Sequence, residues 1–261
     1  PGAAIWNRDP DRSILPLHLD VISDWTGVGV GQLETMLLTR WTGLISQGVS
    51  ARGHTPWILP LGVYHRVRRR AGLLFCPLCL GSGPADALWM WRMAWSICCV
   101  THGTALLDVC PECSGPYMPH RSAPSLLGRM PCAHCGKDLS RAHPPLAPAW
   151  TVALQRRLES ALIRRSALLH NRGYLALPLF TGLRALAGML LSTRGQEMVV
   201  LILGSRRPIQ GVISGRAFEL QPLPIRTSIL KVCWKLLAAW PRSFLEAAQA
   251  TDFRTCDAEK A

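Results

Sequence analysis

The spacing of apolar residues predicts a mainly helical chain that begins with two short helices. Apolar side chains recur at helical intervals over residues 16–25, and Thr26 and Gly27 then end that helix. The face that they form comprises Leu17, Val21, Ile22 and Trp25. Residues 31–38 repeat the pattern, with an apolar stripe of Leu33, Met36 and Leu37. Two short helices around a glycine turn are compatible with a helix-turn-helix, although such pairs also occur in any helical bundle.

The C-terminal part of the chain shows the same periodicity after a proline-rich linker at residues 143–149. Residues 150–170 are expected to form an amphipathic helix with leucines on one face and arginines on another, although Arg165 falls among the leucines. The leucines are Leu154, Leu158 and Leu162, and the arginines are Arg157 and Arg164. Residues 228–240 predict a last helix, which a proline stops. The run 199–203 is the best candidate for a strand, but its composition fits a helix equally well.

Ten cysteines carry the candidate chemistry, and their spacing indicates metal binding. Without a secretion signal, so many cysteines favour metal or redox chemistry over disulfides. Six of them form three C-x-x-C pairs, and a fourth half-site ends in a histidine. The half-sites are Cys76 with Cys79, Cys99 with His102, Cys110 with Cys113, and Cys132 with Cys135. Two residues between ligands let one tight turn present both side chains to a single ion, and Gly115 or Gly136 would allow the positive φ that such a turn uses.

Neighbouring half-sites pair in order into two sets of four ligands. The first set is Cys76, Cys79, Cys99 and His102, with 19 residues between its halves. The second set is Cys110, Cys113, Cys132 and Cys135, with 18 residues between its halves. Both intervals are typical of zinc ribbons. Since each set already supplies four ligands and leaves no open position, we expect two structural zinc ions per chain and no catalytic zinc.

Other arrangements of these residues stay open from the sequence. Cys98 adjoins Cys99 and could replace it as a ligand, although only Cys99 reproduces the two-residue gap of the other half-sites. The ligand order also matches a RING-like ubiquitin-ligase module, but seven residues separate His102 from Cys110, where a RING needs about two or three. His134 lies between two ligands and should point away from their ion. The remaining histidines and cysteines are expected to be ordinary: His18, His54, His65, His120, His143, His170, Cys233 and Cys256.

Positive charge adds nucleic acid to the candidate partners. The net charge is +13, and residues 144–261 carry 16 basic side chains against 7 acidic ones. Such an excess suits a partner made of phosphates, although a solvated arginine-rich surface would give the same count. The arginines considered as nucleic-acid contacts are Arg66, Arg68, Arg69, Arg70, Arg156, Arg157, Arg164, Arg206 and Arg207.

The sequence lacks the signatures of several other classes of protein. It contains no Walker, G-x-S-x-G or H-E-x-x-H motif, and its acidic residues do not cluster as a magnesium site requires, so we expect a non-catalytic binding protein. The longest apolar run, residues 198–203, has six residues against the roughly 20 that span a bilayer. The first twenty residues mix acids with arginines, unlike a secretory signal. We therefore expect a cytoplasmic location and no membrane partner.

Several stretches resemble the TniQ family, the target-selection adaptors of transposons that use an AAA+ ATPase regulator. They are WILPLG at 57–62, CPLCL at 76–80, WRMAWSICCVTHGTALLDVCPEC at 91–113, CAHCG at 132–136 and LLAAWPRSF at 236–244. The middle block is specific, because an aromatic-rich segment leads into a C-x-x-H-G half-site and at once into the next C-P-x-C. The similarity covers most of the chain.

This resemblance implies a mainly α-helical protein in three parts. They are an N-terminal helical domain with a helix-turn-helix (residues 1–72), two tandem zinc ribbons (73–143) and a C-terminal helical, helix-turn-helix-like domain (144–261). Family members carry a further helical segment before a stretch like WNRDPDRS at 6–13, so we expect the first domain to be truncated at its start.

The resemblance also implies a function in transposition. Family members connect DNA, or a DNA-bound targeting complex such as a CRISPR effector, to the ATPase that recruits the transposase. We therefore expect the AAA+ transposition regulator and DNA or its targeting complex as partners, in the bacterial cytoplasm and at the nucleoid when engaged. A homodimer is compatible with this function. The alternative is a zinc-dependent, DNA-binding transcription regulator unconnected to transposition.

Overall fold

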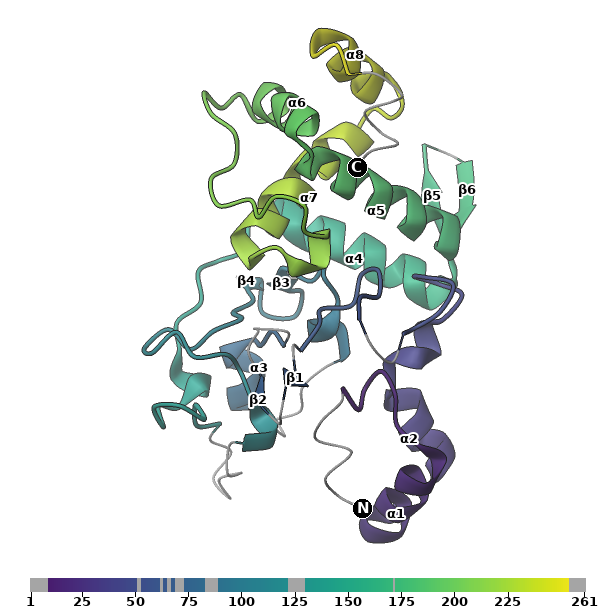
Figure 1. Ribbon diagram of the computed structural model, residues 1–261, viewed down its shortest axis with the longest axis vertical. Helices are drawn as coiled ribbons and strands as arrows, with labels where there is room; N and C mark the ends of the chain where they lie inside the picture. Colours follow the sequence, from purple (N-terminus) through teal and green to yellow (C-terminus); the bar gives the residue numbers. More distant parts are fainter. Residues whose placement is uncertain are drawn as a thin grey trace. The chain divides into compact units, whose positions relative to one another are not determined.

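The computed structural model describes residues 9–50, 53–61, 63–64, 67–68, 73–82, 89–121, 130–170 and 172–253. Helices provide most of its regular structure, as the sequence predicts (Figure 1). The α-helices in this part of the chain are α1 (Pro16–Thr26), α2 (Val30–Met36), α3 (Pro77–Ser82), α4 (Ala149–Arg164), α5 (Ala176–Leu191), α6 (Thr193–Leu203), α7 (Leu223–Leu237) and α8 (Arg242–Ala250). The strands form three two-stranded sheets, β1 (Val63–Tyr64) with β2 (Val67–Arg68), β3 (Cys98–Cys99) with β4 (Thr104–Ala105), and β5 (Ser166–Leu169) with β6 (Arg172–Leu175).

Contacts between Cα atoms divide the chain into two compact units. The N-terminal unit comprises Pro1–Ser96 and Thr104–Leu146, and the C-terminal unit comprises Ile97–Gly103 and Ala147–Ala261. The division into three domains that the resemblance implies stays a prediction.

The two N-terminal helices form where the periodicity places them, but their apolar stripe faces solvent. α1 ends at Gly27, whose φ of +70° lets its N–H donate to the Ser23 carbonyl at 2.8 Å. α1 and α2 contact each other. Leu17 and Trp25, from the predicted stripe, are 67% and 88% exposed, whereas Leu19 from outside the stripe is buried. Most of the predicted stripe is therefore a surface feature of this unit.

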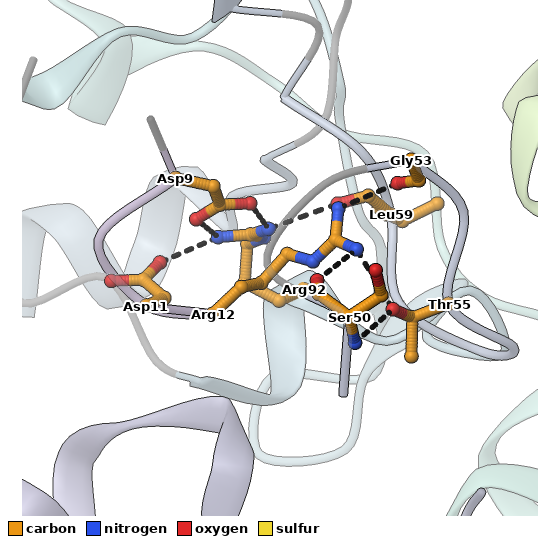
Figure 2. A network of polar contacts seen from close by, with 8 residues as sticks. All are labelled: Asp9, Asp11, Arg12, Ser50, Gly53, Thr55, Leu59 and Arg92. Carbon is orange, nitrogen blue, oxygen red and sulfur yellow. Dashed lines mark hydrogen bonds and ion pairs between the residues drawn. The ribbon is translucent and has the colours of Figure 1, made fainter. Parts of the chain in front are cut away.

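A fully buried arginine organises the N-terminal unit. Arg92 ends the 3-10 helix η3 (Trp89–Arg92) and donates to both carboxylate oxygens of Asp9, at 2.5 and 3.1 Å (Figure 2). It also donates to Asp11 at 2.5 Å and to the Leu59 carbonyl at 3.0 Å. Burial lowers the pKa of Arg92, but the two carboxylates outweigh burial and raise it overall, so the guanidinium stays charged.

A second arginine ties the same segment to a neighbouring loop. Arg12 donates to the Ser50 and Gly53 carbonyls at 2.5 and 2.9 Å and to the Thr55 hydroxyl at 2.8 Å (Figure 2). These bonds satisfy backbone carbonyls at Ser50 and Gly53, which lie outside helices and strands. Together, Arg12 and Arg92 hold the segment around residues 9–12 against Ser50, Gly53, Thr55 and Leu59.

The C-terminal unit buries the apolar faces of four helices against one another. α5 contacts both α6 and α7, and α4 contacts α7 (Figure 1). The buried side chains include Leu154, Leu158, Leu162, Phe180, Leu190, Val199, Ile229 and Cys233. A single residue, Ser192, joins α5 to α6, and the pair is bent by 96°. At this bend a Cβ on Gly195 would lie 2.0 Å from the Met189 carbonyl oxygen, so the turn requires glycine.

Several boundaries in this unit differ from those that periodicity predicts. α4 ends at Arg164, because Arg165 takes a left-handed φ of +58° and the β5–β6 hairpin follows. Arg165 thus lies beyond the helix and does not interrupt its leucine face. Residues 199–203 belong to α6 and form no strand. α5 and α8 were not predicted from the sequence, and α7 begins five residues earlier than its apolar periodicity predicted.

In the part of the chain that the structure describes, no single helix has the length and apolar composition to cross a membrane. α5 and α6 meet that test only as a bent pair.

We predict that Asp9→Asn destabilises the protein far more than Asp11→Asn. The Asp9 side chain is 8% exposed and that of Asp11 is 45% exposed. Losing the first carboxylate leaves a buried charge without its main partner, at a cost of about 3–5 kcal/mol. Losing the second, half-exposed one should cost at most about 1 kcal/mol. Urea unfolding of the metal-loaded protein measures both, with Asp20→Asn on the exposed surface of α1 as the control. Equal losses for the two substitutions would contradict the prediction.

Candidate metal centres

The first group of candidate ligands combines the start of a helix with a tight turn. Cys76 directly precedes α3 and Cys79 lies within it, while Cys99 ends β3 and His102 follows in the turn. Their four ligand atoms lie within 4.8 Å of one another. Cys99 Sγ and His102 Nδ1 are 3.5 Å apart. A tetrahedral zinc ion with ordinary bond lengths separates a sulfur ligand from a nitrogen ligand by about 3.5 Å, so this pair fits such an ion.

The second group consists of four cysteines from two turns of the N-terminal unit. Its ligand atoms also lie within 4.8 Å of one another. Cys110 Sγ and Cys135 Sγ are 3.8 Å apart, and Cys113 Sγ and Cys132 Sγ are 3.7 Å apart. Two sulfur ligands of a tetrahedral zinc ion are about 3.8 Å apart. The spacing of the sulfur atoms is therefore that of a four-cysteine zinc site.

The two groups contain the same residues as the two sets predicted by pairing neighbouring half-sites in order. A cross-braced RING would instead bring Cys110 and Cys113 to Cys76 and Cys79, so the observed grouping argues against the RING alternative. Cys98 belongs to neither group, because its Sγ lies 3.5 Å from the side-chain oxygen of a glutamine on α4. Burial raises the pKa of the Cys98 thiol to about 11.

Three of the four half-sites share one backbone turn. The residue after the second ligand takes a left-handed φ, +63° at Gly103, +57° at Ser114 and +73° at Gly136. In each turn the N–H of that residue donates to the carbonyl of the first ligand, at 2.8 to 2.9 Å. The turn needs this conformation because it points both side chains toward one point. The fourth half-site reaches the same result through the first turn of α3, where the Leu80 N–H donates to the Cys76 carbonyl at 3.1 Å.

Gly115 has a different role from the one that the sequence suggests. The positive φ in its turn belongs to Ser114, so the expectation of a positive φ at Gly115 is wrong. A Cβ on Gly115 would lie 2.6 Å from His134 Cδ2, which shows that glycine is needed there to admit the imidazole ring. His134 is outside the ligand group, as expected.

The thiols of the second group differ in acidity. Burial raises the pKa of Cys132, but the N–H groups of Cys135 and His134 and two neighbouring thiols outweigh burial, so the pKa is lowered overall. The Gly115 N–H lowers the pKa of Cys113, but partial desolvation and hydrogen bonds to the other three thiols together outweigh it and raise the pKa to about 12. Because metal ions bind the thiolate form of cysteine, an ion that binds this group would displace the protons that its thiols carry.

Five of the nine candidate arginines are exposed in the C-terminal unit: Arg156, Arg157, Arg164, Arg206 and Arg207. Two of them make contacts inside this unit. Arg156 donates to the Val100 carbonyl at 3.4 Å, and the Arg157 guanidinium stacks 4.9 Å above the Trp234 ring. Arg68 lies on β2, and Arg66, Arg69 and Arg70 lie outside the described residues, as do His65 and Cys256. Nucleic-acid contact by these arginines stays a prediction.

Arg92 and Gln155 were not predicted from the sequence to support the fold. For Arg92 the available signal is the pair of acids at residues 9 and 11, which could be partners for an arginine flanked by Trp91 and Trp95. Gln155 follows Leu154 on α4 and is 3% exposed. A buried glutamine on an amphipathic helix gives no sign in the sequence that it is buried.

Comparison with known proteins gives one match. A family model described as TniQ matches residues 4–106, which include the first group of ligands. No curated protein and no solved structure shows a significant match to the chain.

We predict that the purified protein contains two zinc ions and that the two sites can be emptied separately. Cys113→Ser should leave one ion, with cobalt in its place giving the spectrum of three sulfurs and one nitrogen. His102→Ala should leave one ion with the four-sulfur spectrum. Because structural zinc contributes roughly 10 to 16 kcal/mol in small peptides, chelation should unfold the segment that holds the sites. One zinc ion or none in folded wild-type protein would refute the assignment.

Proposed function

We propose, from the match of residues 4–106 to the TniQ family model, that this chain is a non-catalytic adaptor for target-site choice in transposition. It links target DNA, or a DNA-bound targeting complex such as a CRISPR effector, to the AAA+ regulator of transposition. The observation that carries this proposal is the match of residues 4–106 to the TniQ family model.

The chemistry of the two ligand groups supports an adaptor. Each group contains four ligands, three cysteines with a histidine or four cysteines, which is the composition of structural zinc sites. A zinc ion with four protein ligands has no position left for water or substrate, so it would hold the fold and activate nothing. In this proposal both ions maintain surfaces that partners recognise.

The exposed arginines of the C-terminal unit support contact with phosphates. Arg164, Arg206 and Arg207 are exposed, and the segment that contains them carries most of the positive charge. Phosphate contacts of this kind position a protein on DNA without reading its sequence. Target choice would then come from the targeting complex, and the arginines would add affinity.

We predict that the immobilised protein captures the purified AAA+ regulator encoded by the same transposon. The expected result is retention of the ATPase by the wild-type, zinc-loaded chain and its loss after chelation, since the zinc-dependent fold presents the binding surface. An unrelated AAA+ ATPase is the control. Target choice that proceeds unchanged in a transposition assay without this protein would refute the adaptor function.

The DNA contact has its own prediction. If each of Arg164, Arg206 and Arg207 neutralises one phosphate, replacing all three by alanine should reduce the log–log slope of DNA affinity against salt by about 2.7. A variant with Arg194→Ala, Arg216→Ala and Arg242→Ala, which also removes three exposed charges, is the matched control. Fluorescence anisotropy with a labelled duplex measures the slope. Equal slopes for the triple variant and the wild type would exclude these arginines as phosphate contacts.

A further inference from the structure

Two adjacent cysteines compete for one ligand position in the first metal centre. Cys98 and Cys99 make up the whole of β3, and successive side chains of a strand point to opposite faces. A half-turn of this two-residue strand, or a shift by one residue along it, would therefore exchange one thiol for the other. Something outside the strand must fix which of them faces the ion.

Gln155, on α4, contacts this strand directly. Its Oε1 accepts the N–H of Ile97 at 3.1 Å, the N–H of Cys98 at 3.2 Å and the thiol of Cys98 at 3.5 Å. Its Nε2 donates to Glu159 Oε1 at 3.0 Å, one turn further along α4. The amide thus has donors on one side and an acceptor on the other, so its orientation is fixed by both ends.

The burial of Gln155 makes these bonds costly to lose. The side chain is 3% exposed, so water cannot replace it as the acceptor for the two N–H groups. The next residue of α4, Arg156, donates to the Val100 carbonyl at 3.4 Å, between the two ligands of the same turn. Two consecutive residues of α4 therefore hold the segment that runs from Ile97 to His102.

We propose that Gln155 is a positioning residue of the first metal centre, which holds Cys98 against α4 and thereby presents Cys99 to the ion. The proposal rests on metal binding by that centre. It also makes α4, the helix that carries Arg156, Arg157 and Arg164, the support of a ligand strand distant in sequence. Loss of Gln155 should then affect the first ion and spare the second.

The main test compares metal release from the two centres in one molecule. In Gln155→Leu, which keeps the size of the side chain but removes its acceptor, zinc should leave the first centre about 10 to 100 times faster, as when other supporting residues of metal ligands are lost. Release from the four-cysteine centre should change by less than about twofold, which serves as the internal reference and the check of folding. Equal release rates from the first centre in the variant and the wild type would overturn the proposal.

A rescue variant separates hydrogen bonding from simple packing. Gln155→Glu combined with Glu159→Gln exchanges the two side chains, so that a carboxylate accepts the strand N–H groups and an amide donates to it from the next turn. This double variant should restore slow zinc release, whereas failure to do so would show that Gln155 acts only by filling space. It also carries the test if Gln155→Leu does not fold.

Cobalt spectra test the choice between the cysteines. Cys98→Ala should keep the spectrum of three sulfurs and one nitrogen, and Cys99→Ala should lose its sulfur-to-metal intensity at that centre. The opposite result would overturn the proposal while leaving metal binding intact. If the wild-type protein gave no spectrum of three sulfurs and one nitrogen, both the first metal centre and the proposal would be refuted.

Discussion

The close approach of four soft ligand atoms is the constraint on which the middle of this protein depends. Each group lies within 4.8 Å, a distance at which several thiolates repel one another unless a cation lies among them. Where the structure describes the segments that connect the ligands, it shows two-residue strands and short helical turns, which offer little stability of their own. The local backbone is accordingly built around the ligands, with a left-handed residue closing each of three turns.

The features that could be predicted from the sequence are those that depend on residues close together in the chain. Apolar periodicity found α1, α4 and α7, and two-residue gaps found the ligand sets, because both patterns repeat within one or two turns. Ser114 shows the limit of such reasoning. It takes the conformation that glycine takes at Gly103 and Gly136, whereas the sequence predicted that conformation for the glycine one position later.

The rest of the candidate site comes from contacts between residues far apart in sequence. Spacing favoured Cys99 over Cys98, but the physical reason for that preference lies 57 positions away, in the buried amide of Gln155. The end of α4 at Arg164 likewise depends on the β5–β6 hairpin, whose first strand was predicted to continue the helix. Apolar periodicity shows that α4 is amphipathic. It does not show that β3 packs on the polar position Gln155, because that contact joins residues far apart in the sequence.

The bond between Asp9 and Arg92 has a consequence for how the chain folds as it is made. Its partners are 83 residues apart, so at a synthesis rate of roughly 5–20 residues per second the carboxylate waits about 4–17 s for its arginine. The ligand turns, by contrast, close loops of a few residues as soon as they emerge. Throughout that interval water hydrates the carboxylates of Asp9 and Asp11, so this segment can pack in its final place only after Arg92 has been made.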